Sequence, residues 1–193
     1  ADDGPRHLER GIHVVTSAVR RDPTSPLGAL KTTSRADDVF ARLEAKRAGA
    51  DDAIFLTVDG HLSEATTANL FVVRGTRIAT PSLATGILAG TTRDWILAWA
   101  SRVGLDATEA MLLPRDLRDA DEAFLSSSVA GILPVTRFDG RVFRRMYLSL
   151  YGFPVEHSVE RMKQLMLQLR DGTVERLQGS GIQGRKVLQR CLN

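Results

Sequence analysis

The chain is poor in the residues that build disulfides and metal centres. Its 193 residues include one cysteine, Cys191, so no second thiol is present to pair with it. A single thiolate also excludes a thiolate-rich metal site, and the four histidines form no His-x-x-x-His pair. We therefore expect no metal ion, and the cysteine usage indicates a reducing, cytoplasmic compartment.

Long apolar runs and nucleotide-binding motifs are also missing. No run approaches the roughly 18 apolar residues that cross a bilayer, and the first residues lack a secretory pattern, so we expect no membrane partner. Neither a G-x-x-x-x-G-K-[ST] phosphate loop nor a G-x-S-x-G nucleophile elbow occurs. Residues 179–184 spell G-x-G-x-x-G, but no hydrophobic strand precedes them and no second strand follows, so we interpret this match as chance.

The charge divides the chain into two parts. Residues 141–193 hold ten basic and four acidic residues, a balance of +6, whereas the whole chain carries +3, which leaves −3 for the first 140 residues. We predict a main domain over 1–140 and a basic segment over 141–193, in which 158–169 can form an amphipathic helix. A basic segment can attract nucleic acid, but a solvated surface has the same composition, and we do not expect that partner.

The hydrophobic pattern predicts a mixed α/β domain with many hairpins. Tight-turn pairs at 59–60, 75–76 and 139–140 predict the hairpins. Clusters of β-branched and other apolar residues predict strands at 11–19, 53–58, 70–73, 77–80, 107–113, 121–126 and 132–136, and the remaining periodic segments predict helices at 35–48, 89–103 and 114–120.

The first predicted helix has the clearest boundaries. We predict Ser34 as its N-cap and Gly49 as the residue that ends it. The apolar residues Val39, Phe40 and Leu43 fall on one face of this helix.

Two charged residues could carry chemistry. Glu64 precedes the buried strand at 70–73, where an acid either caps a turn or faces a positive group. Lys31 lies between a proline-rich loop and a helix start, where partial desolvation would favour the neutral amine and suit Schiff-base chemistry. An ordinary surface lysine is the alternative interpretation.

Two polar clusters could bind an anion. Gly90, Thr91 and Thr92 open a predicted helix, whose free N–H groups and positive dipole end favour a phosphate. A threonine that merely caps this helix is the alternative. The serines at 126–128 follow a predicted strand and could add donors to the same anion, or they could belong to a plain loop.

Four motifs combine these candidates in a fixed order. They are Leu-Lys-Thr-Thr-Ser at 30–34, Gly-His-Leu-Ser-Glu-Ala-Thr-Thr-Ala-Asn-Leu-Phe at 60–71, Leu-Ala-Gly-Thr-Thr-Arg at 88–93 and Asp-Glu-Ala-Phe-Leu-Ser-Ser-Ser at 121–128. In this order the chain, over about residues 11–140, resembles the fold-type IV pyridoxal-phosphate enzymes, the class IV aminotransferases. That family includes branched-chain and D-amino-acid aminotransferases and aminodeoxychorismate lyase.

The resemblance implies the large C-terminal domain of the D-amino-acid aminotransferase-like fold, with mixed, hairpin-rich sheets and flanking helices. By this resemblance we expect the small N-terminal domain of the family to be absent from this chain. By the same resemblance, Lys31 would bind the cofactor pyridoxal 5′-phosphate as a Schiff base and would move the α-proton of the substrate. Glu64 would face the pyridine nitrogen and keep it protonated, so that the ring can accept electrons. Asn69 would have a supporting role.

The resemblance also implies a phosphate site. Thr91 and Thr92, with Gly90 beside them, would hold the 5′-phosphate at the helix N-terminus. Ser128 would be a further phosphate donor.

The implied activity is a pyridoxal-phosphate-dependent, branched-chain-like aminotransferase that acts on an amino acid and a 2-oxo acid. Family members are usually homodimers with a pocket completed across the interface, and we expect a homodimer here.

Three departures from the family pattern leave other functions open. Many relatives have a tyrosine four or five residues after the lysine, whereas this chain reads Ser34-Arg35-Ala36, and some aminodeoxychorismate lyases also show an arginine there. Elimination of pyruvate, as in 4-aminobenzoate synthesis, is therefore one alternative. The absent small domain supplies one wall of the pocket in relatives, and 141–193 does not resemble the family's closing stretch, so a non-catalytic remnant is a second alternative.

Overall fold

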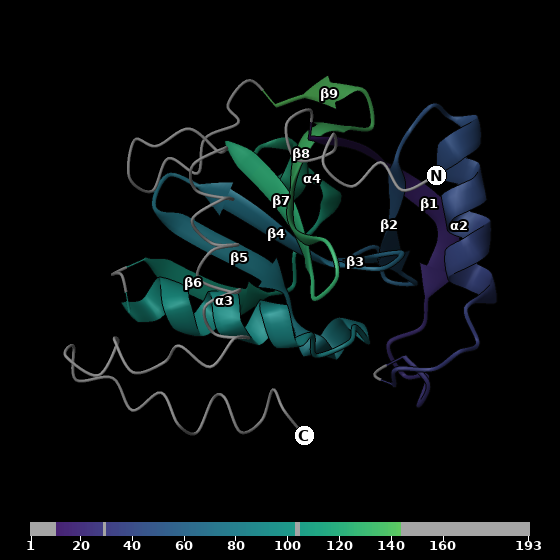
Figure 1. Ribbon diagram of the computed structural model, residues 1–193, viewed down its shortest axis with the longest axis horizontal. Coiled ribbons are helices and arrows are strands. Elements are labelled where there is room, and N and C mark those ends of the chain that lie inside the picture. Colours follow the sequence, from purple (N-terminus) through teal and green to yellow (C-terminus); the bar gives the residue numbers. More distant parts are fainter. Residues whose placement is uncertain (1–10, 29, 103–104, 144–193) are drawn as a thin grey trace.

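The described residues form a curved sheet with helices packed against it (Figure 1). The computed structural model describes residues 11–28, 30–102 and 105–143, and the predicted helix at 158–169 lies outside them. The elements are β1 (Ile12–Arg21), α2 (Ala36–Arg47), β2 (Asp52–Thr57), β3 (Leu62–Ala65), β4 (Asn69–Arg74), β5 (Arg77–Pro81), the 3₁₀ turn η1 (Leu83–Thr85), α3 (Thr91–Arg102), β6 (Asp106–Ala110), α4 (Pro114–Arg118), β7 (Glu122–Ser127), β8 (Gly131–Phe138) and β9 (Arg141–Val142).

All of these strands belong to one mixed sheet. Its order is β3-β2-β1-β8-β7-β4-β5-β6, and β9 pairs with β8. The hairpins β2–β3, β4–β5 and β8–β9 are antiparallel and turn at the three predicted places, where Gly60, Gly75 and Gly140 have positive φ. β1 is parallel to both of its neighbours, β2 and β8, and β5 is parallel to β6. The predicted mixed, hairpin-rich α/β class is confirmed.

The central strand β4 is buried on both faces, because α3 packs against one face and the main core, which includes Leu117 of α4, covers the other. Along β4, Leu70 and Val72 belong to the main core, whereas Phe71 belongs to a second cluster beneath α3. The Phe71 ring stacks on that of Phe124 from β7, with centroids 4.8 Å apart. This alternation of two core faces explains why 70–73 is a continuous hydrophobic run rather than an alternating one.

Helix α2 packs on β1 and β2 through a different face from the one predicted. Ala41 and Ala45, spaced four residues apart, are its buried residues, and their small side chains let the helix approach the sheet closely. The predicted apolar face is exposed instead, with 57% of Val39, 50% of Phe40 and 49% of Leu43 accessible. The prediction chose the face with the larger apolar residues, but close contact between the helix and the sheet favours small side chains.

The predicted N-cap of α2 is also wrong. Arg35, not Ser34, occupies the N-cap position, and no side chain caps the helix there. The Arg35 guanidinium instead donates to the Thr66 carbonyl and forms an ion pair with Asp38, at 3.1 Å from Nε to Oδ2. The predicted end is confirmed, since Gly49 follows the helix with φ +71°.

Three connections of the sheet meet near one another. They are the loop 22–35 between β1 and α2, the turn 66–68 between β3 and β4, and the loop 82–90 that leads into α3. A Cβ built on Gly28 of the first loop would lie 2.8 Å from the Gly86 carbonyl oxygen of the third. No helix within the described ranges is long and apolar enough to span a bilayer.

Candidate functional site

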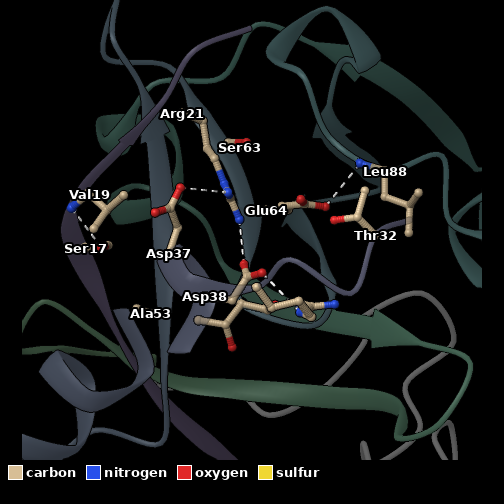
Figure 2. A network of polar contacts seen from close by, with 12 residues as sticks. Ser17, Val19, Arg21, Thr32, Asp37, Asp38, Ala53, Ser63, Glu64 and Leu88 are labelled. Atoms are coloured by element: carbon tan, nitrogen blue, oxygen red, sulfur yellow. Dashed lines mark hydrogen bonds and ion pairs between the residues drawn. The ribbon is translucent and has the colours of Figure 1, made fainter. Parts of the chain in front are cut away.

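Glu64 is a partly buried acid on β3, and its side chain turns towards Leu88 (Figure 2). The backbone N–H of Leu88 donates to Glu64 Oε2 at 3.2 Å. Burial raises the pKa of Glu64 to about 7, and the Leu88 N–H opposes this rise only in part. A carboxyl group of this kind is balanced between its two protonation states near neutral pH, and a cation beside it would favour the charged state.

An ion-pair cluster missed by the sequence reasoning lies beside Glu64. Arg21, at the end of β1, reaches Asp38 of α2 at 2.5 Å, and Asp37 at 3.8 Å. Asp38 also pairs with Arg35. The two arginines lower the pKa of Glu64 and Asp38 raises it, so their influences partly cancel. The only sequence signal for this cluster was an acidic first turn in α2.

The segment that carries Lys31 reaches the vicinity of Glu64. Figure 2 draws Thr32, the next residue, in the same view as Glu64, and Arg35 of this segment donates to the carbonyl of Thr66, two residues after Glu64. Lys31 itself is exposed, so the described residues do not supply the desolvation that the sequence suggested. The loop reaches this point through successive tight turns, with Ser25 N–H donating to the Asp22 carbonyl and Leu30 N–H to that of Leu27.

The start of α3 forms the candidate phosphate seat, which we define as Gly90, Thr91 and Thr92. Thr91 is exposed and Thr92 is buried. The Asp94 N–H donates to the Gly90 carbonyl, which places Gly90 just before the first turn and leaves the N–H groups of that turn without partners inside the helix. A twelve-residue helix also contributes the positive end of its dipole. The structure places these three residues at the N-terminus of α3, and their binding of an anion stays a prediction.

The side chain of Asn69 lies against Gly90 of the phosphate seat. Its Nδ2 donates to the Leu88 carbonyl at 3.0 Å, and a Cβ built on Gly90 would lie 2.2 Å from its Oδ1. Only glycine leaves room for Asn69 in this position. Leu88 therefore connects the acid and the phosphate seat, because its N–H binds Glu64 and its carbonyl binds Asn69.

Two serines lie at the end of β7, but they are placed differently. Ser126 pairs directly with Asn69 in the sheet, and its hydroxyl is buried without a partner among the described residues. Ser128, the predicted donor, is exposed in the turn that follows. Of the three serines that the sequence indicated, the structure thus favours Ser126, whose hydroxyl has no partner among the described residues.

Arg93 directly follows the phosphate seat in the chain and was not among the site residues predicted from the sequence. Its side chain is fully buried and reaches the Pro81 carbonyl at 3.1 Å and Glu109 at 2.9 Å. The hydrogen bond from Arg93 holds the pKa of Glu109 below its usual value. Because both partners lie on strands β5 and β6, Arg93 anchors the first turn of α3 to the sheet.

Comparison with known proteins identifies this arrangement. The family described as amino-transferase class IV matches residues 3–138. The branched-chain-amino-acid aminotransferase of Escherichia coli is 34% identical over 139 residues, which are 71% of this chain and 45% of the enzyme. The described fold matches part of the fold-type IV aminotransferase scaffold. The chain belongs to the class IV aminotransferase family, whose members depend on pyridoxal phosphate.

Solved structures agree with this assignment. The branched-chain aminotransferase of Thermoproteus uzoniensis, solved with norvaline, superposes with a TM-score of 0.75 at 28% identity, covering 86% of this chain and 54% of that one. A Legionella pneumophila protein assigned to 4-amino-4-deoxychorismate lyase superposes with a TM-score of 0.72, also at 28% identity, covering 82% and 56%. The chain spans about half the length of the curated relatives that it matches.

Proposed function

We propose that this chain binds pyridoxal 5′-phosphate and belongs to an aminotransferase that moves an amino group between a branched-chain-like amino acid and a 2-oxo acid. The observation that carries the proposal is the connection through Leu88. One residue joins Glu64, an acid with a raised pKa, to Asn69 and the phosphate seat. The cofactor has an anionic phosphate at one end and a basic ring nitrogen, and the two parts of the site match these two groups.

The described residues fit the cofactor at three points. The partnerless Ser126 hydroxyl and the first turn of α3 offer donors to a phosphate. Gly90 keeps space that a side chain would fill. Glu64 offers a carboxylate whose buried position strengthens its attraction for a ring N–H⁺. Thr91, Thr92 and Ser128 remain the proposed phosphate ligands, with Ser126 as the addition.

Each residue has a defined task. When bound, the cofactor serves as an electron sink for the carbon that loses its proton. Glu64 holds the proton on the ring nitrogen, which requires its ionised form. Lys31 supplies the amine that attaches the cofactor, and it accepts and returns the proton at the substrate α-carbon. Asn69 fixes Leu88 and through it the orientation of Glu64.

Two observations favour the lyase as a second candidate. The chain resembles the Legionella pneumophila protein about as closely as it resembles the archaeal aminotransferase. Arg35 also occupies the position at which a tyrosine is common in aminotransferases. Release of pyruvate together with 4-aminobenzoate from aminodeoxychorismate would support the lyase, whereas turnover that requires a 2-oxo acid would support the aminotransferase.

The homodimer remains a proposal and is tested by sedimentation of the full chain.

Titration with pyridoxal phosphate tests the cofactor proposal. We expect the full chain to develop a visible absorbance band that disappears in Lys31→Ala. Lys46→Ala is the matched control, because Lys46 is an exposed lysine on α2, and it should keep the band. The same band in wild type and Lys31→Ala would remove Lys31 from its role, and no band in the wild type would contradict cofactor binding.

A further inference from the structure

The turn between β3 and β4 connects the two proposed cofactor contacts. Glu64 lies at one end of it and Asn69 at the other, and the Ala65 N–H closes it by donating to the Ala68 carbonyl. Thr66 is the deepest residue of the turn, with 1% of its surface exposed, whereas the neighbouring Thr67 is exposed. The position of Thr66 therefore sets how the chain passes from the acid to the asparagine.

Asp52 holds Thr66 from one side. It is the first residue of β2 and is itself buried, and its Oδ1 accepts a 2.6 Å hydrogen bond from the Thr66 hydroxyl. The same oxygen accepts the Ala53 N–H at 2.8 Å. Burial raises the pKa of Asp52, and hydrogen bonds from the hydroxyl and the backbone of Thr66 oppose that rise. A buried acid is thus satisfied mainly by one threonine, and losing that partner would be costly.

Arg35 holds Thr66 from the other side. Its Nη2 donates to the Thr66 carbonyl, and its Nε pairs with Asp38. Arg35 follows Lys31 by four residues and occupies the N-cap position of α2. The contact with Thr66 therefore ties the segment that carries the proposed Schiff-base lysine to the turn that carries the proposed ring-nitrogen partner.

We propose that Asp52 and Arg35 are positioning residues, which clamp Thr66 through its hydroxyl and its carbonyl and so fix Glu64 relative to Asn69 and to the Lys31 loop. The clamp itself is a property of the chain without cofactor. Its consequence for binding rests on the proposed function. The apolar clusters around β2 and β4 include none of Asp52, Thr66 and Arg35, so loosening the clamp should act on the turn before it acts on the fold.

The Leu88 amide reports the clamp without any cofactor, because it donates to Glu64. In the cofactor-free full chain, we expect Thr66→Val to speed hydrogen exchange of this amide by about tenfold relative to amides of β4, as for the loss of a charge-assisted hydrogen bond. Thr67→Val, a matched change at the exposed neighbour, should leave it unchanged. Thr66→Ser, which keeps the hydroxyl, should restore slow exchange.

A second pair of variants changes arginines, so that the proposal can still be tested if Thr66→Val fails to fold. Arg35→Gln removes the contact with the Thr66 carbonyl, and Arg47→Gln, at the exposed end of α2, is its control. Faster Leu88 exchange in Arg35→Gln alone supports the clamp. Unchanged Leu88 exchange in Arg35→Gln, or equal changes in Thr66→Val and Thr67→Val, would overturn it.

Cofactor affinity tests the consequence separately. We expect the Kd for pyridoxal phosphate to rise by about tenfold in Thr66→Val and in Arg35→Gln, and to stay at the wild-type value in Thr66→Ser. If the wild type fails to bind pyridoxal phosphate, the proposed function fails while the exchange result still decides the clamp. If the wild type binds and the loosened variants bind equally well, the positioning role is wrong.

Discussion

The two segments that supply the proposed cofactor contacts are built in opposite ways. The β3–β4 turn is anchored to distant elements, because the Asp52 and Arg35 side chains bind Thr66 and the Asn69 side chain donates to the Leu88 carbonyl. The loop 22–35 is largely exposed; its first part is held by short-range turns, and Arg35 at its end contacts Thr66 and Asp38. Glu64 therefore has a fixed and electrostatically tuned environment, whereas Lys31 lies at the surface of the described residues.

This difference separates two roles in the proposed site: electrostatic stabilisation of the cofactor and covalent attachment to it. A carboxylate that stabilises a bound cation should be in position before the cofactor binds, since moving it into place would cost part of the electrostatic stabilisation. A lysine that forms and breaks a covalent bond during turnover needs freedom to move. We infer that the β3–β4 turn provides the preorganisation, while the Lys31 side chain stays exposed on a loop whose end Arg35 ties to that turn.

The largest expected effect comes from neutralising the enclosed acid. Glu64→Gln keeps the shape of the side chain but cannot hold a proton on the ring nitrogen, so turnover should fall by at least about a hundredfold while pyridoxal phosphate still binds. Steady-state assay of amino-group transfer measures the change. Glu44→Gln, a carboxylate of α2 bonded to Ser17, is the control and should keep its turnover. Wild-type turnover in Glu64→Gln would exclude the proposed role.

The next effect is a pH dependence of stability. Because the pKa of Glu64 is raised from 4.5 to about 7, the folded chain retains a proton that the unfolded chain has lost in this window. The free energy of unfolding should therefore fall as pH rises from about 4.5 to about 7, by at most about 3 kcal/mol.

Urea denaturation at about pH 5 and about pH 8 measures this dependence in wild type and in Glu64→Gln. Asp52 has a raised pKa in both proteins, so the difference between them isolates Glu64. Identical pH slopes would mean that Glu64 titrates normally and that its environment is not the enclosed one described above.

A smaller effect should follow from filling the space at Gly90. Gly90→Ala places a Cβ against Asn69 Oδ1, which displaces the asparagine that holds Leu88. We expect affinity for pyridoxal phosphate to fall by about tenfold, as measured by calorimetry. The double variant with Asn69→Ala removes the clash, so the two changes should be less than additive. Full affinity in Gly90→Ala would show that the seat does not depend on this close approach.

The smallest effect is expected on the open loop. Ser34 is not the N-cap of α2, so Ser34→Ala should change the free energy of unfolding by less than about 0.5 kcal/mol. An N-cap serine would cost about 1 kcal/mol. Thermal denaturation distinguishes these values, and the larger loss would mean that Ser34 caps the helix in solution.

The sequence predicted the parts of the fold that depend on local patterns. The three hairpins, the buried run at 70–73 and the start of α3 follow from turn pairs, apolar runs and a glycine before threonines. The α2 face was mispredicted because contact with the sheet favours Ala41 and Ala45 over larger apolar residues. No local pattern carries that information.

The sequence indicated residues of the candidate site but not the contacts between them. The motifs indicated Lys31 and Glu64, yet the link between Glu64 and Asn69 passes through the backbone of Leu88, whose side chain has no part in it. Ion pairs such as that of Arg21 with Asp38 join residues on different elements. Such contacts arise only when the sheet is assembled, so the sequence could not specify them.

The central claim is that Lys31 and Glu64 face one bound cofactor. The most direct test is to add pyridoxal phosphate to the full chain, reduce with borohydride and locate the modified lysine by peptide mass spectrometry. The chain has four lysines, Lys31, Lys46, Lys163 and Lys186, so every alternative can be distinguished. We predict that Lys31 alone carries the reduced cofactor. Modification of another lysine in preference to Lys31, or of none, would contradict the claim.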